Sequence, residues 1–395
     1  MANVSSSNGI EKYPKLRFPQ YIDSWDGIRF GDLIEEFSHR TKVEDEDVLL
    51  SAAIEGMFLN TELFGHQRGA SNKGYKKIEY GTLVLSTQNL HLGNANVNLR
   101  FEHGMVSPAY KTYRIKNCSV TLLAEWIKSE KAKQFFYDAT TVGASVCRRN
   151  VEWETLYDQT LYLPTHNEQK HIAEFLSLVS ERIRKQEKFI DCLKKYKRGV
   201  ISKLFSREIR FTKKDGSSFP EWREYPLDSV VEFLDGQRKP LESAERANRK
   251  GAYPYYGASG IIDYIDNYIF DEPLLLLGED GANIITRSSP LCFIATGKYW
   301  VNNHAHVMRP KQGFDLRFVC EALESIDYTK YNTGTAQPKL NQEKCRQILF
   351  TYPCYEEQQC ISSFLSSITK RIMDSEEQLS LLATQKKSLL QQLFI

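Results

Sequence analysis

The sequence predicts an α+β protein with two pseudo-repeated globular domains separated by two long antiparallel coiled-coil helices. Three observations lead to this prediction: the chain contains an internal repeat, each copy ends in a long amphipathic segment, and short strand-like runs precede that segment. We expect globular domains over residues 1–163 and 207–352, and spacer helices over 164–206 and 353–395.

The repeat is clearest where each copy passes from a proline into a Glu-Gln pair. Pro164 and Glu168-Gln169 match Pro353 and Glu357-Gln358 at an offset of 189 residues, and this offset continues without a gap to the end of the chain. Upstream the likeness is looser, with a Phe-Pro pair and a tryptophan opening each copy at 18–25 and 219–222. Residues 42–137 and 235–331 do not align. The frame is therefore duplicated while its contents differ.

The repeated segment carries an apolar stripe with steps of three and four residues, a period of about 3.5 that is typical of a coiled coil. Polar residues, Gln186 and Ser375, occupy one slot in each stripe. A capping box over 165–168 and the proline before it predict the helix start. The predicted stalk interface is Ile172, Leu176, Val179, Ile183, Ile190, Leu193, Val200 and Leu204 with Ile361, Leu365, Ile368, Ile372, Leu379, Leu382, Leu389 and Leu393.

The alternative interpretation of such a stripe is a helix packed on a globular core. Each segment is roughly 40 residues long, about three times the usual helix length, and would extend on the order of 60 Å. The stripe is narrow and occurs twice, so each helix has an evident partner. Chain order then makes the helices antiparallel, because the first leads away from domain one and the second returns to it.

The composition excludes several classes of protein. Over 395 residues the hydrophobic fraction is 41%, the charged fraction is 26% and the formal net charge is +2, which are values of a folded multi-domain chain. No run of eighteen apolar residues occurs and the first ten residues are polar, so neither a membrane span nor a signal peptide is expected. Eight scattered cysteines without a CxxC pair predict reduced thiols and a cytoplasmic location.

Within the globular halves, short β-branched and aromatic runs bounded by turn residues predict strands, whereas longer amphipathic runs predict helices. The expected sheet is mixed or antiparallel. The strands are expected at 81–86, 110–115, 274–277, 291–295 and 305–308, and the helices at 122–137 and 316–326.

No catalytic signature is present: the chain lacks a phosphate-binding loop, a dinucleotide fingerprint, a nucleophile elbow and a zinc-protease helix. His304 and His306 could offer two imidazoles to a metal, but alternation along a strand places such residues together without one. The turn Gly278-Glu279-Asp280-Gly281 could be an acid pair, although a tight turn is the simpler interpretation. We therefore expect no metal, no cofactor and no catalysis by this chain.

The remaining polar signals suit recognition of a nucleic acid, because Arg and Lys contact phosphates while Arg, Asn and Gln read base edges. Solvated loops are the default interpretation of any one of them. The loop with Gln88 and Asn89 also contains His91, Asn94, Asn96 and Asn98. The candidate DNA-binding residues are Arg68, Lys73, Gln88, Asn89, Arg148, Arg149, Tyr255, Tyr256, Arg287, His304, Gln337 and Lys339.

A duplicated frame, variable inserts and two long helices together resemble the specificity subunit of type I restriction–modification enzymes. The residues that carry the likeness are the Leu163-Pro164 and Glu168-Gln169 pairs with their second copies at 352–358, and the ordered motifs Ser107-Pro108-Ala109-Tyr110, Tyr255-Tyr256-Gly257-Ala258-Ser259-Gly260, Gly278-Glu279-Asp280-Gly281, Asn303-His304-Ala305-His306-Val307 and Gln337-Pro338-Lys339-Leu340-Asn341. The likeness covers essentially the whole chain. The first copy departs from it at residues 146–149, where Val-Cys-Arg-Arg stands in place of Gln-Pro-Lys-Leu.

The resemblance implies that each insert is a target-recognition domain for one half of an interrupted, asymmetric site in double-stranded DNA. It also implies that the helices space the two halves and that two methyltransferase subunits dock on the frame, with motor–nuclease subunits joining for restriction. Adenine methylation would then belong to the partner.

Two other hypotheses remain open at this point. An adaptor with the same stalk, whose inserts bind proteins, fits the near-neutral charge; an isolated DNA methyltransferase or nuclease would need catalytic motifs that are absent.

Overall fold

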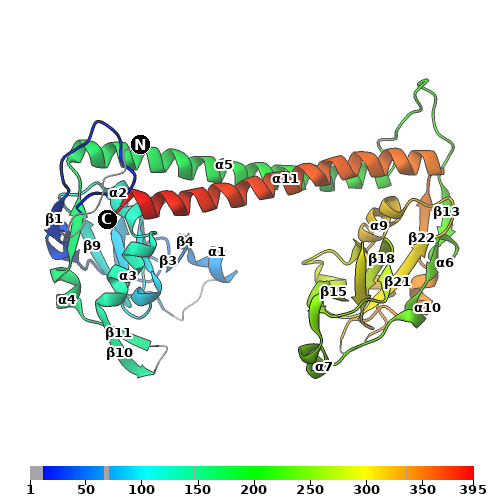
Figure 1. The fold of residues 1–395 in the computed structure, drawn as a ribbon, viewed down its shortest axis with the longest axis horizontal. Coiled ribbons are helices and arrows are strands. Elements are labelled where there is room, and N and C mark those ends of the chain that lie inside the picture. The colour runs from blue at the N-terminus through cyan, green and yellow to red at the C-terminus, as the bar shows by residue number, and fades with distance from the viewer. Residues whose placement is uncertain (1–11, 66–70, 146–147, 335–336) are drawn as a thin grey trace. The chain divides into compact units, whose positions relative to one another are not determined.

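The computed structural model describes residues 12–65, 71–145, 148–334 and 337–395 (Figure 1). Two compact units emerge: unit 1 comprises Met1–Lys188 and Glu377–Ile395, and unit 2 comprises Phe189–Glu376. Both long helices, α5 (His166–Phe205) and α11 (Tyr355–Leu393), contribute one part to each unit. Each unit therefore contains an insert and parts of both helices, so the unit boundaries fall inside the helices rather than before them.

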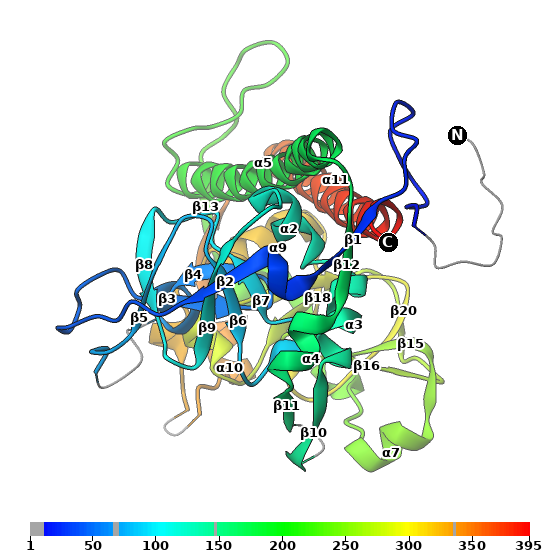
Figure 2. The same cartoon turned by 90° about the vertical axis from the view of Figure 1, so that its left-hand side faces the viewer.

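Unit 1 is built on a four-stranded antiparallel sheet with the order β2-β9-β6-β7, which faces the viewer in Figure 2. Its strands are β2 (Ile34–Phe37), β9 (Tyr110–Ile115), β6 (Leu83–Ser86) and β7 (Ala95–Val97). Strand β6 lies between β9 and β7, and its residues Leu83, Val84 and Leu85 are all fully buried. A separate pair, β1 (Asp26–Arg29) with β12 (Thr160–Leu163), leads into α5.

Helices and hairpins complete unit 1. One predicted helix over 122–137 is wrong, because Ser129 starts a new helix by accepting a hydrogen bond from the amide of Ala132. The helical elements are η1 (Phe30–Leu33), α1 (Asn60–Phe64), η2 (Leu90–Leu92), α2 (Val120–Trp126), α3 (Glu130–Asp138) and α4 (Trp153–Asp158). The hairpins are β3 (Leu50–Ala53) with β4 (Gly56–Leu59) and β10 (Thr140–Ser145) with β11 (Arg148–Val151), and the non-consecutive strands β5 (Lys76–Glu79) and β8 (His103–Val106) form an antiparallel pair.

Unit 2 contains an equivalent antiparallel sheet with the order β14-β21-β18-β19. Its strands are β14 (Val231–Phe233), β21 (Ala305–Pro310), β18 (Leu274–Gly278) and β19 (Cys292–Ala295), and the pair β13 (Arg223–Pro226) with β22 (Leu349–Tyr352) leads into α11. The predicted strands at 110–115, 274–277 and 305–308 are confirmed, and those at 81–86 and 291–295 begin one or two residues later.

The insert of unit 2 differs by a second sheet, β16-β15-β20-β17, in which β15 and β20 run parallel. Its strands are β15 (Lys250–Gly257), β16 (Gly260–Ile265), β17 (Phe270–Asp271) and β20 (Lys298–Val301). The helical elements of unit 2 are α6 (Leu227–Val230), η3 (Asp235–Gln237), α7 (Ser243–Asn248), α8 (Asn283–Thr286), α9 (Leu316–Glu324), η4 (Thr329–Tyr331) and α10 (Gln342–Arg346).

The repeat therefore extends into the inserts, which sequence comparison had treated as unrelated. The four-stranded sheets share one strand order, and α2 and α9 bind the long helices in the same way. The amide of Ser119, the N-cap of α2, donates to Gln169 Oε1 at 2.8 Å, and the amide of Asp315, the N-cap of α9, donates to Gln358 Oε1 at 2.8 Å. The described parts of the two units differ in their additional hairpins, sheets and short helices.

The apolar stripes of α5 and α11 face each other within each unit, as predicted. In unit 1, Ser180 lies 2.8 Å from Lys386 and Gln186 lies 3.4 Å from Gln378, so the partner number falls as the α5 number rises and the helices are antiparallel. At the ends the stripe also joins a domain core: Ile172 and Leu176 in unit 1, and Val200, Leu204, Ile361, Leu365, Ile368 and Ile372 in unit 2. Between these ends, Val179, Ile183, Leu193 and Leu382 are half-buried. Both interpretations of the stripe therefore hold in part.

The Glu-Gln pair at the start of each long helix anchors that helix to its unit. The carboxylate of Glu168, which is fully buried, accepts two hydrogen bonds of 2.7 Å from Arg17. Glu357 is held equivalently by Arg210 and by the indole of Trp222. The charge of Glu168 is thus buried together with a counter-charge, which offsets the cost of removing the carboxylate from water.

Candidate nucleic-acid interface

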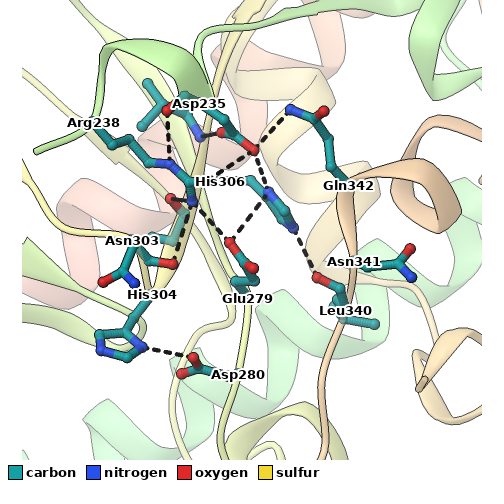
Figure 3. A network of polar contacts seen from close by, with 12 residues as sticks. Asp235, Arg238, Glu279, Asp280, Asn303, His304, His306, Leu340, Asn341 and Gln342 are labelled. Atoms are coloured by element: carbon teal, nitrogen blue, oxygen red, sulfur yellow. Dashed lines mark hydrogen bonds and ion pairs between the residues drawn. The ribbon is translucent and has the colours of Figure 1, made fainter. Parts of the chain in front are cut away.

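Segments that lie far apart in the sequence meet at one end of the unit 2 sheet. The ends of β14 and β18 and the start of β21 lie there, since Phe233 pairs with Met308 and Gly278 with Ala305. Segment 337–342 closes the group by two backbone hydrogen bonds, Leu340 N–H to Glu279 O at 2.7 Å and Gly281 N–H to Pro338 O at 3.0 Å. We call this group, residues 235–238, 278–281, 303–306 and 337–342, the unit 2 edge (Figure 3).

A buried charge network holds the unit 2 edge together. His306, which is 1% exposed, donates from Nδ1 to Asp235 Oδ2 at 2.6 Å and from Nε2 to the carbonyl of Leu340 at 2.9 Å. Arg238 bonds Glu279 Oε2 at 2.8 Å and the carbonyl of Ala305 at 2.8 Å. Figure 3 shows these side chains pointing toward one another from separate elements.

The protonation of His306 follows from its partners. A carboxylate and a carbonyl both accept, so both ring nitrogens carry hydrogen and the ring is an imidazolium. Burial opposes that charge, but the hydrogen bonds to Asp235 and Cys345 outweigh it and raise the pKa of His306 to about 10. Burial likewise opposes ionisation of Asp235, whose bond to His306 nevertheless lowers its pKa.

The same donors determine whether a metal fits the network. Asp235, Glu279 and His306 offer ligand atoms within 4.8 Å of one another. Both nitrogens of His306 already donate hydrogen bonds, and Arg238 supplies a further cation beside the two carboxylates. The trio is therefore a salt-bridge network. His304 bonds a different acid, Asp280, at 2.6 Å, so the two histidines do not converge on one point.

The outward rim of the unit 2 edge is polar. His304 and Lys339 each have side chains that are 51% exposed, and Asn303 and Gln337 are exposed beside them. Lys339 lies 3.4 Å from Glu279, so its ammonium group is tied to the network beneath. Imidazole, amide and ammonium groups together can donate to and accept from base edges and phosphates.

The other predicted residues of unit 2 do not join this rim. Tyr255 is fully buried and its hydroxyl accepts the amide of Leu241, so it belongs to the core. Tyr256 is half-buried, although its carbonyl accepts the amide of Asn302 and places the turn after β15 beside the edge. Arg287 is held by Glu324 at 2.7 Å and has a left-handed backbone with φ of 50°, which fits a structural role.

Unit 1 has an equivalent edge. Gln88 and Asn89 follow β6 as residues 279–281 follow β18, and both are exposed. The amide of Thr87 donates to Ala109 O at 3.3 Å, as that of Glu279 donates to His304 O at 2.8 Å. The segment before β9 thus corresponds to the segment before β21. We call residues 87–89 and 107–110 the unit 1 edge.

The neighbouring asparagines of unit 1 are structural instead. Asn94, Asn96 and Asn98 are buried, and their side-chain amides donate to backbone carbonyls, with Asn94 and Asn96 holding the turn of the β3–β4 hairpin. Lys128 joins them by donating to Ile54 O, Ala95 O and Asn96 Oδ1 at 2.9, 3.3 and 2.6 Å. The sequence signal for this structural role was the alternation of asparagines at 94, 96 and 98 in a turn-rich segment.

Lys73 is exposed, but it precedes β5 and is distant in the sequence from the strand ends that form the unit 1 edge. Arg149 is half-buried; it bonds Thr140 Oγ1 and O, both at 2.7 Å, and its guanidinium lies 4.1 Å from the Tyr137 ring. For Arg148 only the backbone, in β11, is described. Arg68 and the turn residues 146–147 lie outside the described residues.

Sequence reasoning missed Asp235, Arg238 and Gln342, which complete the unit 2 edge from outside the recognised motifs. Gln342 donates to Asp235 Oδ2 at 2.8 Å. It also missed Arg17 and Arg210. The sequence signal for these arginines was indirect, because the repeated glutamates at 168 and 357 require a cation if they are buried. Arg17 and Arg210 do not align with each other, so neither is conspicuous among the 52 basic residues.

Comparison with known proteins fits this architecture. Residues 220–383 match the family model for the type I restriction modification DNA specificity domain. A type I restriction enzyme specificity subunit of Methanocaldococcus jannaschii is 24% identical over 92% of this chain and 90% of its own length. One from Haemophilus influenzae is 34% identical, but the match covers 38% of this chain and spans only 37% of that relative.

Solved structures show the same fold. The S subunit of a type I restriction–modification system from M. genitalium has a TM-score of 0.57 at 16% identity, covering 97% of this chain and 99% of its own. A chain from a study of complex assembly and conformational transition of the type I R-M system has a TM-score of 0.55 at 14% identity, covering 93% and 96%.

The matched domain, residues 220–383, is similar to a DNA specificity domain of the restriction–modification class. Over nearly its whole length, the chain is similar to type I specificity subunits. Across the residues that the structure describes, no helix combines the length and the apolar character needed to cross a bilayer.

Proposed function

We propose that this chain reads a bipartite, asymmetric DNA sequence, with each unit recognising one half-site. The observation that carries the proposal is that two sheets of the same strand order bear different additions: hairpins in unit 1 and a second sheet in unit 2. A common frame presents both surfaces in the same way, whereas different additions read different bases. The unit 1 edge and the unit 2 edge, which lie at the same end of equivalent sheets, are the proposed reading surfaces.

The chemistry of these edges supports reading rather than catalysis. In the unit 2 edge the ionised groups are paired with one another, and the exposed rim offers amide, imidazole and ammonium groups. The proposed DNA-contacting residues are Gln88 and Asn89 in unit 1, and His304, Gln337 and Lys339 in unit 2. Lys73 and Arg149 are proposed to contact phosphates beside the first half-site. Base chemistry on adenine is assigned to the partner, because this sequence contains neither a nucleophile elbow nor a dinucleotide fingerprint.

We assign docking of two methyltransferase subunits to the repeated frame, with motor–nuclease subunits joining for restriction. A repeated frame offers two similar docking surfaces, and a related system is known to assemble as a complex. In this proposal the long helices set the distance between the two half-sites.

The proposal is tested by exchanging one insert. Residues 42–137 are replaced by the corresponding insert of a relative, and the methylated sequence is determined in cells that also carry the methyltransferase. We expect one half of the recognised site to change while the other half and the gap stay constant. Exchange of 235–331 is the matched control and should change only the other half.

The outcomes separate the hypotheses. A change in both halves would contradict modular reading. If footprinting of the complex with its methyltransferase protects no defined sequence, the chain is a protein-binding adaptor. A further test adds four residues to both helices at matched positions, which lengthens each by about 6 Å. The tolerated gap should then grow by a base pair or two.

A further inference from the structure

The apolar stripes of α5 and α11, here called the seams, each contain a second polar position beside Gln186 and Ser375, and a search for apolar residues does not detect it. Lys197 lies four residues after Leu193 and three before Val200, so it is in step with the stripe. Lys386 lies 189 residues further on and is its equivalent in α11. Both side chains are only 21% exposed. A half-buried charge thus stands at the same place in both copies.

Each lysine forms an ion pair with a glutamate on a short helix of the same unit. In unit 2, Lys197 Nζ lies 2.6 Å from Glu321 Oε1 on α9. In unit 1, Lys386 Nζ lies 2.7 Å from Glu125 Oε2 on α2, and 2.8 Å from Ser180 Oγ, which donates to Glu125 Oε1 at 2.9 Å. Two independent units therefore contain the same clamp.

The two glutamates occupy equivalent places. Glu125 follows the α2 N-cap Ser119 by six residues, and Glu321 follows the α9 N-cap Asp315 by six residues. The sequences of these helices do not otherwise align. A charge pair retained at one position in dissimilar surroundings indicates a role tied to the shared frame rather than to either insert.

The energetics favour a role in specificity over one in stability. A partly buried ion pair contributes little net stability, because desolvation offsets its attraction. An aliphatic residue at the same seam position would bury more apolar surface, while a polar seam residue selects one register of packing at some cost in stability. A shift by one heptad moves a helix about 10 Å and breaks the pair.

We propose that Lys197 and Lys386 are positioning residues that hold α9 and α2 in one register on the long helices. They thereby fix the place of each reading edge along its own part of the stalk. This inference rests on the proposed function, since it concerns how the reading surfaces are held. It adds that two seam lysines, rather than the apolar stripe alone, make the gap between half-sites selective.

The test replaces each lysine and its glutamate by leucine, in the full chain with its methyltransferase, so that no unpaired carboxylate is left. We expect Lys197→Leu with Glu321→Leu, and Lys386→Leu with Glu125→Leu, to leave the thermal midpoint unchanged or raise it. The preference for the correct gap over one that is a base pair longer or shorter should fall at least about fivefold. If a lysine only stabilised the fold, the thermal midpoint and the selectivity for the correct gap would fall together. The control is Lys194→Leu, whose pair with Glu376 is 46% exposed and lies beside the seam, and which should retain selectivity.

Charge reversal and a distance measurement complete the test. Lys197→Glu alone should lose gap selectivity, and the double variant Lys197→Glu with Glu321→Lys should restore it. Spin labels at Lys203→Cys and Ser325→Cys, both exposed and both in unit 2, report the register without DNA. We expect one narrow distance distribution in the parent chain and a broadened or shifted one in Lys197→Leu with Glu321→Leu.

An unchanged distribution or undiminished gap selectivity in Lys197→Leu with Glu321→Leu would overturn the inference. If no DNA sequence is recognised by the parent complex, the proposed function fails instead, and the spin-label distances alone decide the role of the lysine.

Discussion

Replacing Arg17 by methionine tests the buried anchor at the start of α5. Glu168 is fully buried and accepts both of its 2.7 Å hydrogen bonds to Arg17, so the substitution leaves a carboxylate in the core without that counter-charge. These bonds also raise the pKa of Arg17, which shows the direction of the coupling. Breaking a buried pair in this way costs about 3–5 kcal/mol. For a unit of this size that corresponds to a midpoint lowered by roughly 6–20 °C.

Calorimetry of three variants measures this cost. Arg210→Met should lose less than Arg17→Met, because Glu357 keeps the Trp222 indole at 3.2 Å. Arg29→Met removes a surface pair whose side chains are 59% and 67% exposed, and should change stability by less than about 1 kcal/mol. Equal losses in Arg17→Met and Arg29→Met would refute the reasoning, since burial would then not set the cost. Adding Glu168→Gln to Arg17→Met should recover much of the loss.

Three further predictions concern the unit 2 edge and the β3–β4 hairpin of unit 1. The pKa of His306 in the folded chain is raised to about 10, so the stability that its charge gives the fold is complete below pH about 6.5 and declines as the pH rises toward 10. The thermal midpoint should therefore fall between pH 6.5 and 9, and His306→Gln should flatten this fall. Gly278→Ala would place a Cβ 2.7 Å from the carbonyl oxygen of Ala258, so it should displace the β15–β16 turn and weaken binding of the second half-site. Gly236→Ala, which has open space around the new Cβ, should leave that binding unchanged. Equal binding by the two variants would contradict this prediction. Lys128→Met removes the donor to three oxygens, and hydrogen exchange should accelerate in β3 and β4 while the antiparallel pair β5–β8 stays protected.

The fold was predictable to the extent that it depends on periodicity. The 3.5-residue stripe and its repetition identify α5 and α11 and their pairing, because regular spacing of side chains survives in any tertiary context. The internal equivalence of the two sheets was only partly predictable. Strands β2 and β14 lie in the aligned frame, with Glu35 matching Glu232, whereas β6 and β18 are alike only in their leucines, which any buried strand can contain. A strand needs only an apolar face that fits its neighbours, so many sequences satisfy one topology.

The candidate site was predictable only in part. His304, Gln337 and Lys339 were expected to recognise a partner and do lie together, because their motifs flank the ends of neighbouring strands. Tyr255 was equally conspicuous in the sequence but is buried, since its position in β15 points it into the core. Local sequence gives the type of a side chain, whereas the direction in which it points depends on strand register.

By itself the sequence determined the repeat, the two long helices and their antiparallel pairing, since these follow from spacing along the chain. Tertiary structure alone decided which polar residues are buried partners and which are exposed. Lys197 and Lys386 interrupt an apolar stripe and become intelligible only when Glu321 and Glu125 are brought within 3 Å of them. The physical reason is that the role of a charged side chain depends on the groups around it. Folding brings these groups together from segments that lie more than a hundred residues apart in the sequence.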